Sequence, residues 1–313
     1  MKVLFIDSVH PILEDRLKMM GFACEHDYTS NRETIIKKLP DFEGIVIRSR
    51  IKVDGAFLSS AKQLKFIARS GAGLENIDLD AAKKRGIHLF SAPEGNRQAV
   101  GEHSLGMILS LFNRLSLADQ EIRSGKWQRE ANRGFELSGK TIGIIGYGNM
   151  GKAFAKCLSG FDCEVLTYHL SDTSDDYAKK SSLESIQNKA QIISFHTPYD
   201  DSTHHYLDES FVQKMKHPFY VINTARGKVI KTKALVEGLK SNQILGACLD
   251  VLEYEKGCFE NLFENEMPED FNYLINSPKV LLSPHVAGWT HESYEKLSSV
   301  LADKIETTFL KFR

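Results

Sequence analysis

One glycine-rich segment restricts the fold of this chain more than any other feature of its sequence. Its residues are Gly146-Tyr147-Gly148-Asn149-Met150-Gly151, directly after the apolar run Thr141–Ile145 and before a helix-like stretch at 152–158. The first glycine permits a tight turn, the second lets the backbone approach a pyrophosphate, and the third lets helix and strand pack closely. The helix N-terminus then offers unpaired N–H groups to the phosphates. The segment therefore predicts a dinucleotide-binding unit.

The residue that should distinguish NAD from NADP is unusual. The strand expected after this helix, Glu164–His169, should end in an acid that binds the adenosine ribose. That position holds His169, so the usual sequence signal for NAD is absent. His169 could face the 2′-phosphate of NADP, or it could cap the strand. Asp172, Asp175 and Asp176 follow and could oppose a phosphate.

Short apolar runs alternate with helix-like segments through almost the whole chain. Their continuous Val, Ile and Leu content is typical of parallel strands covered on both faces. Strand–helix alternation at this spacing predicts βαβ units, and so an α/β fold with doubly wound parallel sheets. The expected strands are Val3–Asp7, Gly44–Arg48, Lys65–Arg69, Ile87–Phe90, Thr141–Ile145, Glu164–His169, Gln191–His196, Tyr220–Thr224, Ile244–Val251 and Val280–Ser283.

The helix-like segments indicate two domains. Residues 95–125 have a wide apolar face and predict one long helix that joins the domains, after a turn at 92–96. The segment Glu292–Phe312 is also helical in pattern, and we expect it to return to the first domain. We therefore expect a discontinuous first domain, 1–96 plus 287–313, and a dinucleotide-binding domain, 97–286.

Composition excludes several classes of protein. Charged residues make up 26% of the chain and the net charge is −1, which indicates neither a nucleic-acid nor an anionic-membrane partner. Five scattered cysteines without a Cys-x-x-Cys motif argue against a disulfide framework or a zinc site, so we expect no metal. No segment has the pattern of a signal peptide or a membrane span. We expect a soluble cytoplasmic protein with reduced thiols.

Three charged or titratable side chains follow strands of the second predicted sheet. Arg226 carries a planar guanidinium suited to binding a carboxylate with two hydrogen bonds. His285 supplies a histidine, the residue type that suits the exchange of a hydroxyl proton. Glu255 would orient that ring and favour the imidazolium. Each residue alone has a structural alternative. Arg226 could form a surface ion pair, His285 could be a hydrogen-bonded structural histidine, and Glu255 could be a solvated loop acid. Together, downstream of a dinucleotide loop, they favour hydride transfer with a hydroxy acid.

At this point the chain resembles the D-isomer-specific 2-hydroxyacid dehydrogenases, and within them the D-3-phosphoglycerate dehydrogenases. The resemblance covers nearly the whole chain. It is specific, because several motifs occur in the family's order. They are 68–78, Ala92-Pro93-Glu94-Gly95-Asn96 with Glu102-His103, the glycine loop, His196-Thr197-Pro198, 223–227 and Ser283-Pro284-His285.

The resemblance implies a flavodoxin-like substrate domain and a Rossmann dinucleotide-binding domain, in a homodimer usually formed through the latter. It implies that Arg226 binds and polarises the substrate, that Glu255 pairs with the catalytic His285, and that Asp250 bonds the nicotinamide carboxamide. The full set that we assign to the cofactor is Gly146, Tyr147, Gly148, Asn149, Met150, Gly151, His169, His196, Thr197, Pro198, Thr203, Thr224, Ala225, Asp250 and Gly288.

For the substrate, the resemblance implies a carboxylate-receiving loop and nearby arginines. The loop is Ser70-Gly71-Ala72-Gly73, while Arg48-Ser49-Arg50 and Arg69 are similar to the phosphate-side arginines of phosphoglycerate enzymes. Three guanidiniums would suit a phosphorylated acid. For Arg48 and Arg50 the alternative is a solvated strand end.

The expected function is therefore the interconversion of D-3-phosphoglycerate and 3-phosphohydroxypyruvate with NAD, NADP not being excluded, as a step in serine biosynthesis. The alternatives are a glyoxylate or hydroxypyruvate reductase, another 2-hydroxyacid dehydrogenase, or a non-catalytic NAD-sensing protein similar to corepressors of this fold. Residues 255–285 are longer than in many relatives and could reshape the active-site rim or the dimer contact. Because the sequence ends at Arg313, we expect no serine-binding regulatory domain.

Overall fold

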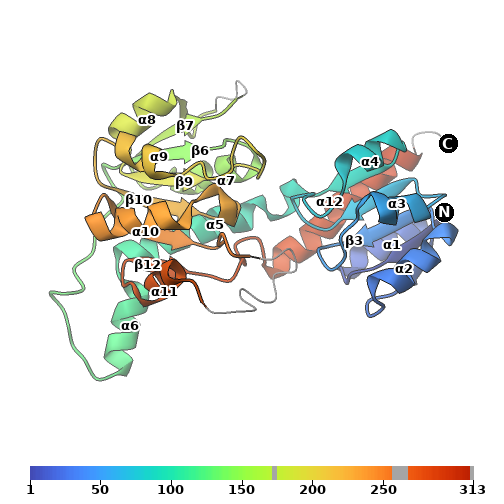
Figure 1. Ribbon diagram of the computed structural model, residues 1–313, viewed down its shortest axis with the longest axis horizontal. Coiled ribbons are helices and arrows are strands. Elements are labelled where there is room, and N and C mark those ends of the chain that lie inside the picture. Colours follow the sequence, from blue (N-terminus) through green and yellow to red (C-terminus); the bar gives the residue numbers. More distant parts are fainter. Residues whose placement is uncertain (171–174, 256–266, 311–313) are drawn as a thin grey trace. The chain divides into compact units, whose positions relative to one another are not determined.

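The computed structural model describes residues 1–170, 175–255 and 267–310, and the chain divides into two compact units (Figure 1). The first unit comprises Met1–Asn96 and Trp289–Arg313, and the second comprises Arg97–Gly288. Two regions discussed above, Asp172 and the part of the predicted insertion at 256–266, lie outside the described residues.

The first unit contains a five-stranded parallel sheet in the order β2-β1-β3-β4-β5. The order reverses between β1 and β3, as in flavodoxin-like folds. Helices cover both faces of the sheet. Its elements are β1 (Lys2–Phe5), α1 (Pro11–Met19), β2 (Ala23–His26), α2 (Arg32–Lys38), the 3₁₀ turn η1 (Leu39–Asp41), β3 (Gly44–Ile47), α3 (Gly55–Ser60), β4 (Phe66–Arg69), α4 (Leu79–Lys84), β5 (His88–Ser91) and α12 (His291–Leu310).

The last helix, α12, belongs to the core of this first unit. Its residues Leu297, Leu301 and Ile305 are buried in one cluster with Val3 and Phe66. Burying each such side chain contributes roughly 1.5–3 kcal/mol. The C-terminal helix therefore packs on the first sheet.

The second unit contains a seven-stranded parallel sheet in the order β12-β11-β10-β9-β6-β7-β8. Its elements are β6 (Thr141–Ile145), α7 (Asn149–Leu158), β7 (Glu164–Tyr168), β8 (Lys179–Lys180), α8 (Leu183–Lys189), β9 (Ile192–Phe195), α9 (Glu209–Lys214), β10 (Phe219–Asn223), the 3₁₀ turn η2 (Gly227–Val229), α10 (Thr232–Ser241), β11 (Ile244–Leu249), α11 (Glu269–Asn276) and β12 (Val280–Leu282). The predicted fold class, two doubly wound parallel sheets, is confirmed.

Strand register brings the loops of the second sheet to one edge. Ile145 pairs with Phe195, which pairs with Asn223, and this residue pairs with Leu249, the partner of Leu282. Since all five strands end at this line, the segments that follow them leave the sheet at the same carboxyl edge. The strand order reverses between β6 and β9, which is where ligands bind in doubly wound sheets.

Two expectations about secondary structure were wrong. Residues 95–125 form two helices, α5 (Pro93–Phe112) and α6 (Leu115–Arg123), because Arg114 adopts a left-handed conformation with φ 53° that ends helical geometry. The predicted turn at 92–96 is mostly the first turn of α5, where Pro93 is tolerated because no helical acceptor exists for its missing N–H.

The strands β2 and β8 were not predicted. Both lie at sheet edges, and most of their side chains are exposed, so neither has the apolar run that marks a buried strand. Separately, none of the helices in the described ranges is both long and apolar enough to cross a membrane.

Candidate active site

The glycine loop has the close contacts that its pattern predicts. Gly146 has φ 93°, and a Cβ there would lie 2.7 Å from the carbonyl oxygen of His196. A Cβ at Gly151 would lie 2.2 Å from the carbonyl oxygen of Gly146. Gly148 faces open space immediately before α7, whose first residues are Asn149 and Met150. A side chain is thus excluded at two positions, and the third leaves the helix N-terminus accessible to a phosphate.

His169 is bonded to this loop. Its Nδ1 accepts a hydrogen bond from the backbone N–H of Tyr147 at 3.3 Å. The Tyr147 side chain is buried, and its hydroxyl donates to Asp175 Oδ1 at 2.6 Å. Burial, followed by this bond to Asp175, raises the pKa of Tyr147, so the phenol stays protonated and keeps donating. His169 therefore holds the loop against the end of β7.

The segment after β9 lies across the point where the strand order reverses. His196 is buried and its Nε2 lies 2.8 Å from Ser194 Oγ, while burial lowers the pKa of His196 to about 3. Thr203 Oγ1 donates to the carbonyl of Pro198 at 2.8 Å and so closes the following loop. His196 Nδ1 and Thr197 Oγ1 are buried without a partner among the described residues.

These observations fit a dinucleotide. Two glycines allow the backbone of the loop to pack closely, and two buried polar atoms without partners among the described residues lie beside it, where a bound cofactor could supply partners. Among the residues that the structure describes, no three His, Cys, Asp or Glu side chains gather as a metal site requires.

The loop after β10 is shaped by Asn223, which is fully buried. Its Oδ1 accepts from the N–H of Ala225 at 3.1 Å, and its Nδ2 donates to the carbonyl of Arg226 at 3.0 Å. One guanidinium nitrogen of Arg226 donates to the Ala225 carbonyl at 2.7 Å. Thr224 Oγ1 lies 3.0 Å from Ser104 Oγ. The backbone that carries Arg226 is therefore fixed by hydrogen bonds.

Gly227 brings the Arg226 loop against the loop after β11. A Cβ at Gly227 would lie 1.9 Å from the carbonyl oxygen of Leu252, so any side chain would force the two loops apart. On the second loop, Glu253 Oε1 lies 2.7 Å from His205 Nε2, and Glu253 Oε2 accepts from the N–H of Thr232. Burial raises the pKa of Glu253, but these hydrogen bonds hold it below its ordinary value.

His285 and Glu255 form a direct pair. The distance from His285 Nδ1 to Glu255 Oε2 is 2.7 Å, and Glu255 Oε1 accepts from the N–H of Leu252 at 2.5 Å. His285 has φ 55°, which is unusual for a residue other than glycine. Its N–H donates to the carbonyl of Asp250 at 2.8 Å, which holds this strained backbone in place. The sequence-predicted acid and histidine are thus together.

The buried carboxylate of Asp250 organises the His285 loop. Oδ1 accepts from Ser283 Oγ at 2.6 Å and from the N–H of Val286 at 2.9 Å. Oδ2 accepts from the N–H of Ala287 at 2.9 Å. His103 Nε2 lies 2.9 Å from Ser283 Oγ and 3.5 Å from Asp250 Oδ1. Asp250 therefore positions the loop, in addition to the cofactor contact expected of it. Gly288 ends the unit just beyond this loop.

In the first unit, Arg50 and Arg48 have different surroundings. Arg50 donates to the carbonyls of Ser30, Ile6 and Asp27 at 2.6, 2.7 and 2.9 Å, and its Nε lies 3.4 Å from Asp7 Oδ1. Arg48 instead places its guanidinium over the ring of Trp289, 3.9 Å from the centroid. Arg50 thus supports the fold at this edge of the sheet, whereas Arg48 is turned to an aromatic face.

Arg69 and the loop 70–73 lie beside Arg48. Arg69 Nε donates to the carbonyl of Arg48 at 3.3 Å, and a Cβ at Gly71 would lie 2.0 Å from an Arg69 guanidinium nitrogen. Ser70 is buried and its N–H donates to the Ile47 carbonyl. Ser49, Ala72 and Gly73 are half-buried. The absence of a side chain at Gly71 lets the guanidinium lie against the loop.

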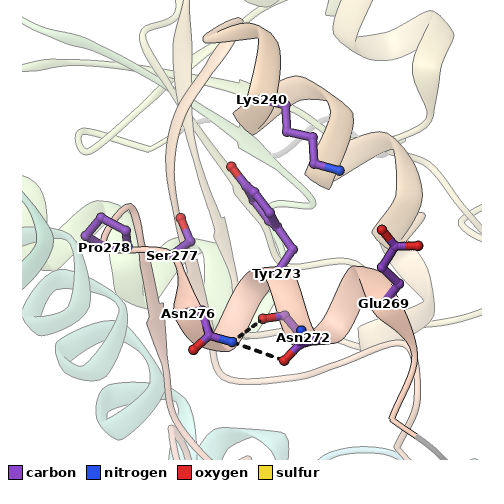
Figure 2. A pocket seen from close by; sticks show the side chains of 7 residues that line it. All are labelled: Lys240, Glu269, Asn272, Tyr273, Asn276, Ser277 and Pro278. Carbon is purple, nitrogen blue, oxygen red and sulfur yellow. Dashed lines mark hydrogen bonds between the residues drawn. The ribbon is translucent and has the colours of Figure 1, made fainter.

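A separate hollow of about 450 Å³ lies between α10 and α11 (Figure 2). Lys240 lies over the ring of Tyr273, 5.1 Å from its centroid, and Asn276 donates to the Asn272 carbonyl at 2.8 Å. None of the sequence-predicted site residues lines this hollow. We therefore do not assign the chemistry to it.

Sequence reasoning missed four residues that organise these loops, namely Asn223, His103, Ser283 and Trp289. The first three lie inside motifs that had been recognised, at 223–227, at Glu102-His103 and at 283–285. Their polar side chains next to apolar runs were a usable signal. Trp289 gave no such signal, because its partner Arg48 is distant in the sequence.

Comparison with known proteins supports the resemblance. Residues 105–287 match the profile of the D-isomer specific 2-hydroxyacid dehydrogenase, NAD binding domain. The chain is 32% identical to D-3-phosphoglycerate dehydrogenase of Archaeoglobus fulgidus over 97% of its own length, but spans only 56% of that relative. It is 34% identical to glyoxylate reductase of Thermofilum pendens, covering 93% of this chain and 87% of that one.

A solved structure of similar fold agrees with these sequence comparisons. The chain superposes with a TM-score of 0.83 on D-lactate dehydrogenase of Aquifex aeolicus complexed with NAD and lactic acid. The two are 28% identical, and the alignment covers 99% of this chain and 96% of the other.

Proposed function

The chain belongs to the D-isomer-specific 2-hydroxyacid dehydrogenase family, and on that premise we propose that it interconverts a small D-2-hydroxy acid and its 2-oxo acid with a nicotinamide dinucleotide. The observation that carries the proposal is the His285–Glu255 pair, with its 2.7 Å contact. Arg226 follows a strand that ends at the same sheet edge. The first unit is then the substrate domain and the second the dinucleotide domain.

The chain's own residues supply the proton chemistry. When bound, the nicotinamide gives or takes the hydride at the substrate carbon. His285 exchanges the hydroxyl proton, and since Nδ1 faces Glu255, we assign this exchange to Nε2. The carboxylate of Glu255 lies against Nδ1 and orients the ring, and the imidazolium is the form that donates to a 2-oxo group. General acid–base catalysis of this kind contributes roughly 10²–10⁴-fold in rate.

Arg226 binds the substrate carboxylate and polarises the neighbouring carbonyl. A guanidinium recognises a carboxylate with two parallel hydrogen bonds, and a Lys in its place could not do so. Asn223 and Gly227 hold the Arg226 loop, while Asp250 holds the His285 loop. Such fixed geometry avoids reorganisation during the reaction.

The proposed substrate is D-3-phosphoglycerate, with 3-phosphohydroxypyruvate as its 2-oxo acid, in a step of serine biosynthesis. The cationic residues Arg48 and Arg69 beside the loop 70–73 support a phosphorylated acid. Glyoxylate or hydroxypyruvate is the second candidate, favoured by the 34% identity to a glyoxylate reductase. We also propose a homodimer, which light scattering tests.

The preferred dinucleotide is NAD. His169 is bonded to Tyr147 through Nδ1, and the Asp175 carboxylate on the other side of Tyr147 would repel a 2′-phosphate. We expect NADH to bind more tightly than NADPH in a fluorescence titration. Tighter NADPH binding would reverse this assignment.

Initial rates with 3-phosphohydroxypyruvate, hydroxypyruvate, glyoxylate and pyruvate test the reaction and the substrate together. The proposed substrate should have the highest kcat/KM. Good turnover of glyoxylate with none of 3-phosphohydroxypyruvate would replace it with the second candidate. Cofactor binding without turnover of any 2-oxo acid would indicate the NAD-sensing alternative.

A further inference from the structure

His103, on α5, contacts the loop that carries His285. The His103 side chain is partly buried, and its Nε2 lies 2.9 Å from Ser283 Oγ and 3.5 Å from Asp250 Oδ1. Ser283 stands two residues before His285. All four residues belong to the second unit. His103 is therefore joined to the His285 loop through a serine and a buried carboxylate, and the proposed function leaves it without a role.

The distances assign a direction to these hydrogen bonds. A carboxylate only accepts, and Asp250 Oδ1 lies 2.6 Å from Ser283 Oγ, so the single hydroxyl proton of Ser283 points to Asp250. The lone pairs of Ser283 then face His103, which donates from Nε2–H. The reverse direction would place two acceptors 2.6 Å apart. The hydrogen bonds therefore run from His103 through Ser283 to Asp250, and His103 carries a proton on Nε2.

Without this donor, the Ser283 hydroxyl has another acceptor. Met107 Sδ, also on α5, lies 3.8 Å from Ser283 Oγ, and a thioether sulfur is a weak acceptor. Donation by His103 to the lone pairs of Ser283 favours the rotamer in which the hydroxyl points to Asp250. It also strengthens the bond to Asp250, because successive hydrogen bonds polarise one another.

Asp250 connects this hydrogen bond to the backbone around His285. Its carbonyl accepts the His285 N–H at 2.8 Å, and its two carboxylate oxygens accept the N–H groups of Val286 and Ala287, each at 2.9 Å. His285 has φ 55°, a strained conformation that persists only where surrounding contacts hold it. A rotation of the Asp250 carboxylate would weaken the contacts that hold this backbone.

We propose that His103 is a positioning residue, whose Nε2–H donates to Ser283 and so keeps Asp250 and the His285 backbone in the geometry that proton exchange needs. The inference rests on the proposed function, in which His285 exchanges the hydroxyl proton. The role of His103 is to donate a hydrogen bond, and its own proton stays in place. An amide N–H at the same point should therefore replace it, whereas an apolar side chain should not.

Two substitutions of His103 test the donor. His103→Leu removes it, and His103→Gln places an amide N–H near the position of Nε2. We expect kcat for the preferred 2-oxo acid to fall about tenfold in His103→Leu and less than about threefold in His103→Gln. KM should change less than about threefold in both, because Arg226 lies on another loop. Ordinary kcat in His103→Leu would overturn the proposal, as would an equal loss in both variants, since donation would then not be the role.

Ser283→Ala tests whether His103 acts through the serine. If it does, the double variant His103→Leu/Ser283→Ala should have about the same kcat as the slower single variant. Ser104, the next residue of α5, is a matched control, because its Oγ lies 3.0 Å from Thr224 Oγ1 on the Arg226 loop. The effects of Ser104→Ala and Ser283→Ala should multiply. Multiplying effects of His103→Leu and Ser283→Ala would contradict the proposal.

Unfolding in urea supplies a readout that needs no turnover. The unfolding equilibrium constants should show a coupling of about fivefold between His103 and Ser283, and no coupling between Ser104 and Ser283. This coupling without turnover of any 2-oxo acid by the unmodified protein would refute the proposed function, and with it the effect of His103 on turnover, but not the hydrogen bonds. Ordinary kcat in His103→Leu would refute the inference alone.

Discussion

The charged side chains at the carboxyl edges of the two sheets differ in their partners. In the second unit the candidate proton-transfer residue His285 is paired with Glu255, and the buried Asp250 accepts from several donors. In the first unit, Arg48 faces the ring of Trp289 instead of an acid. Both edges belong to parallel sheets whose strand order reverses nearby. The same architecture therefore supports both a preorganised set of candidate reactive groups and a cation, Arg48, that faces no acid. We call Arg48 the open cation, the carboxyl edge of the first sheet the open edge, and that of the second sheet the paired edge.

The difference has a physical reason. Groups that act on the reacting atoms must already be oriented, because reorganisation during the reaction raises the barrier. A group that recognises a ligand contributes the most binding free energy when it has no competing partner in the free protein. An internal acid at Arg48 would have to be displaced first, which would reduce the free energy gained on binding. Four predictions test this contrast, beginning with the largest expected effect.

Removing the imidazole of His285, at the carboxyl edge of the second sheet, should have the largest effect on turnover. His285→Asn should lower kcat about a thousandfold, since general acid–base catalysis is lost. Dinucleotide affinity, measured by NADH fluorescence, should change little because the glycine loop is untouched. A variant with ordinary kcat would remove His285 from the mechanism and with it the contrast between the two edges.

The second prediction concerns the stability of the paired edge. Asp250→Ala leaves the Ser283 hydroxyl and the Val286 and Ala287 N–H groups without their acceptor. We expect a loss of about 3 kcal/mol in the free energy of unfolding, measured with urea. The exposed acid Asp201 offers a matched control, because Asp201→Ala should change stability by less than about 0.5 kcal/mol. Equal effects in both variants would contradict the role of Asp250.

The third prediction compares two arginines of the open edge. Arg50→Met removes the donors to three backbone carbonyls and should cost about 2 kcal/mol of stability. Arg48→Met should cost less than about 1 kcal/mol, because only the stacking on Trp289 is lost. Kinetics should show the reverse order, with Arg48→Met losing selectivity for substrates with an anionic tail. If the two variants exchanged these effects, the assignment of Arg48 as the open cation would be wrong.

The smallest effect for a single step, at most about 1.4 kcal/mol for each pH unit, is a pH dependence due to His196. Its pKa is lowered from 6.5 to about 3 by burial, so between these values the unfolded chain binds a proton that the folded protein does not. The stability that it contributes is therefore present above about pH 6.5 and is lost as pH falls toward 3, by at most about 1.4 kcal/mol per pH unit. Urea unfolding between pH 7 and 4.5 should show a shallower decline in His196→Gln. Parallel curves would mean that His196 is protonated in the folded state.

Local patterns in the sequence predicted most of the fold. Continuous apolar runs identified every central strand, and the glycine spacing located the loop at 146–151. The patterns did not predict elements that lack a local hydrophobic signal. The edge strand β2 has exposed side chains, and the backbone of Arg114 divides a segment whose apolar periodicity continues past it. Neither an edge position nor a left-handed residue changes hydrophobic periodicity, so neither could be predicted from it.

By itself, the sequence determined the α/β architecture, located the glycine-rich loop and selected Arg226, Glu255 and His285 as candidate site residues. These depend on residue type and on spacing within one strand–loop–helix unit. Apart from the Glu255–His285 pair, which the sequence predicted, only the tertiary structure decided which side chains are partners. Arg48 and Arg50 lie on one short segment, yet Arg50 meets carbonyls from other loops and Arg48 meets Trp289 from the opposite end of the chain. The partner of a side chain depends on how distant segments pack, which cannot be predicted from the local sequence.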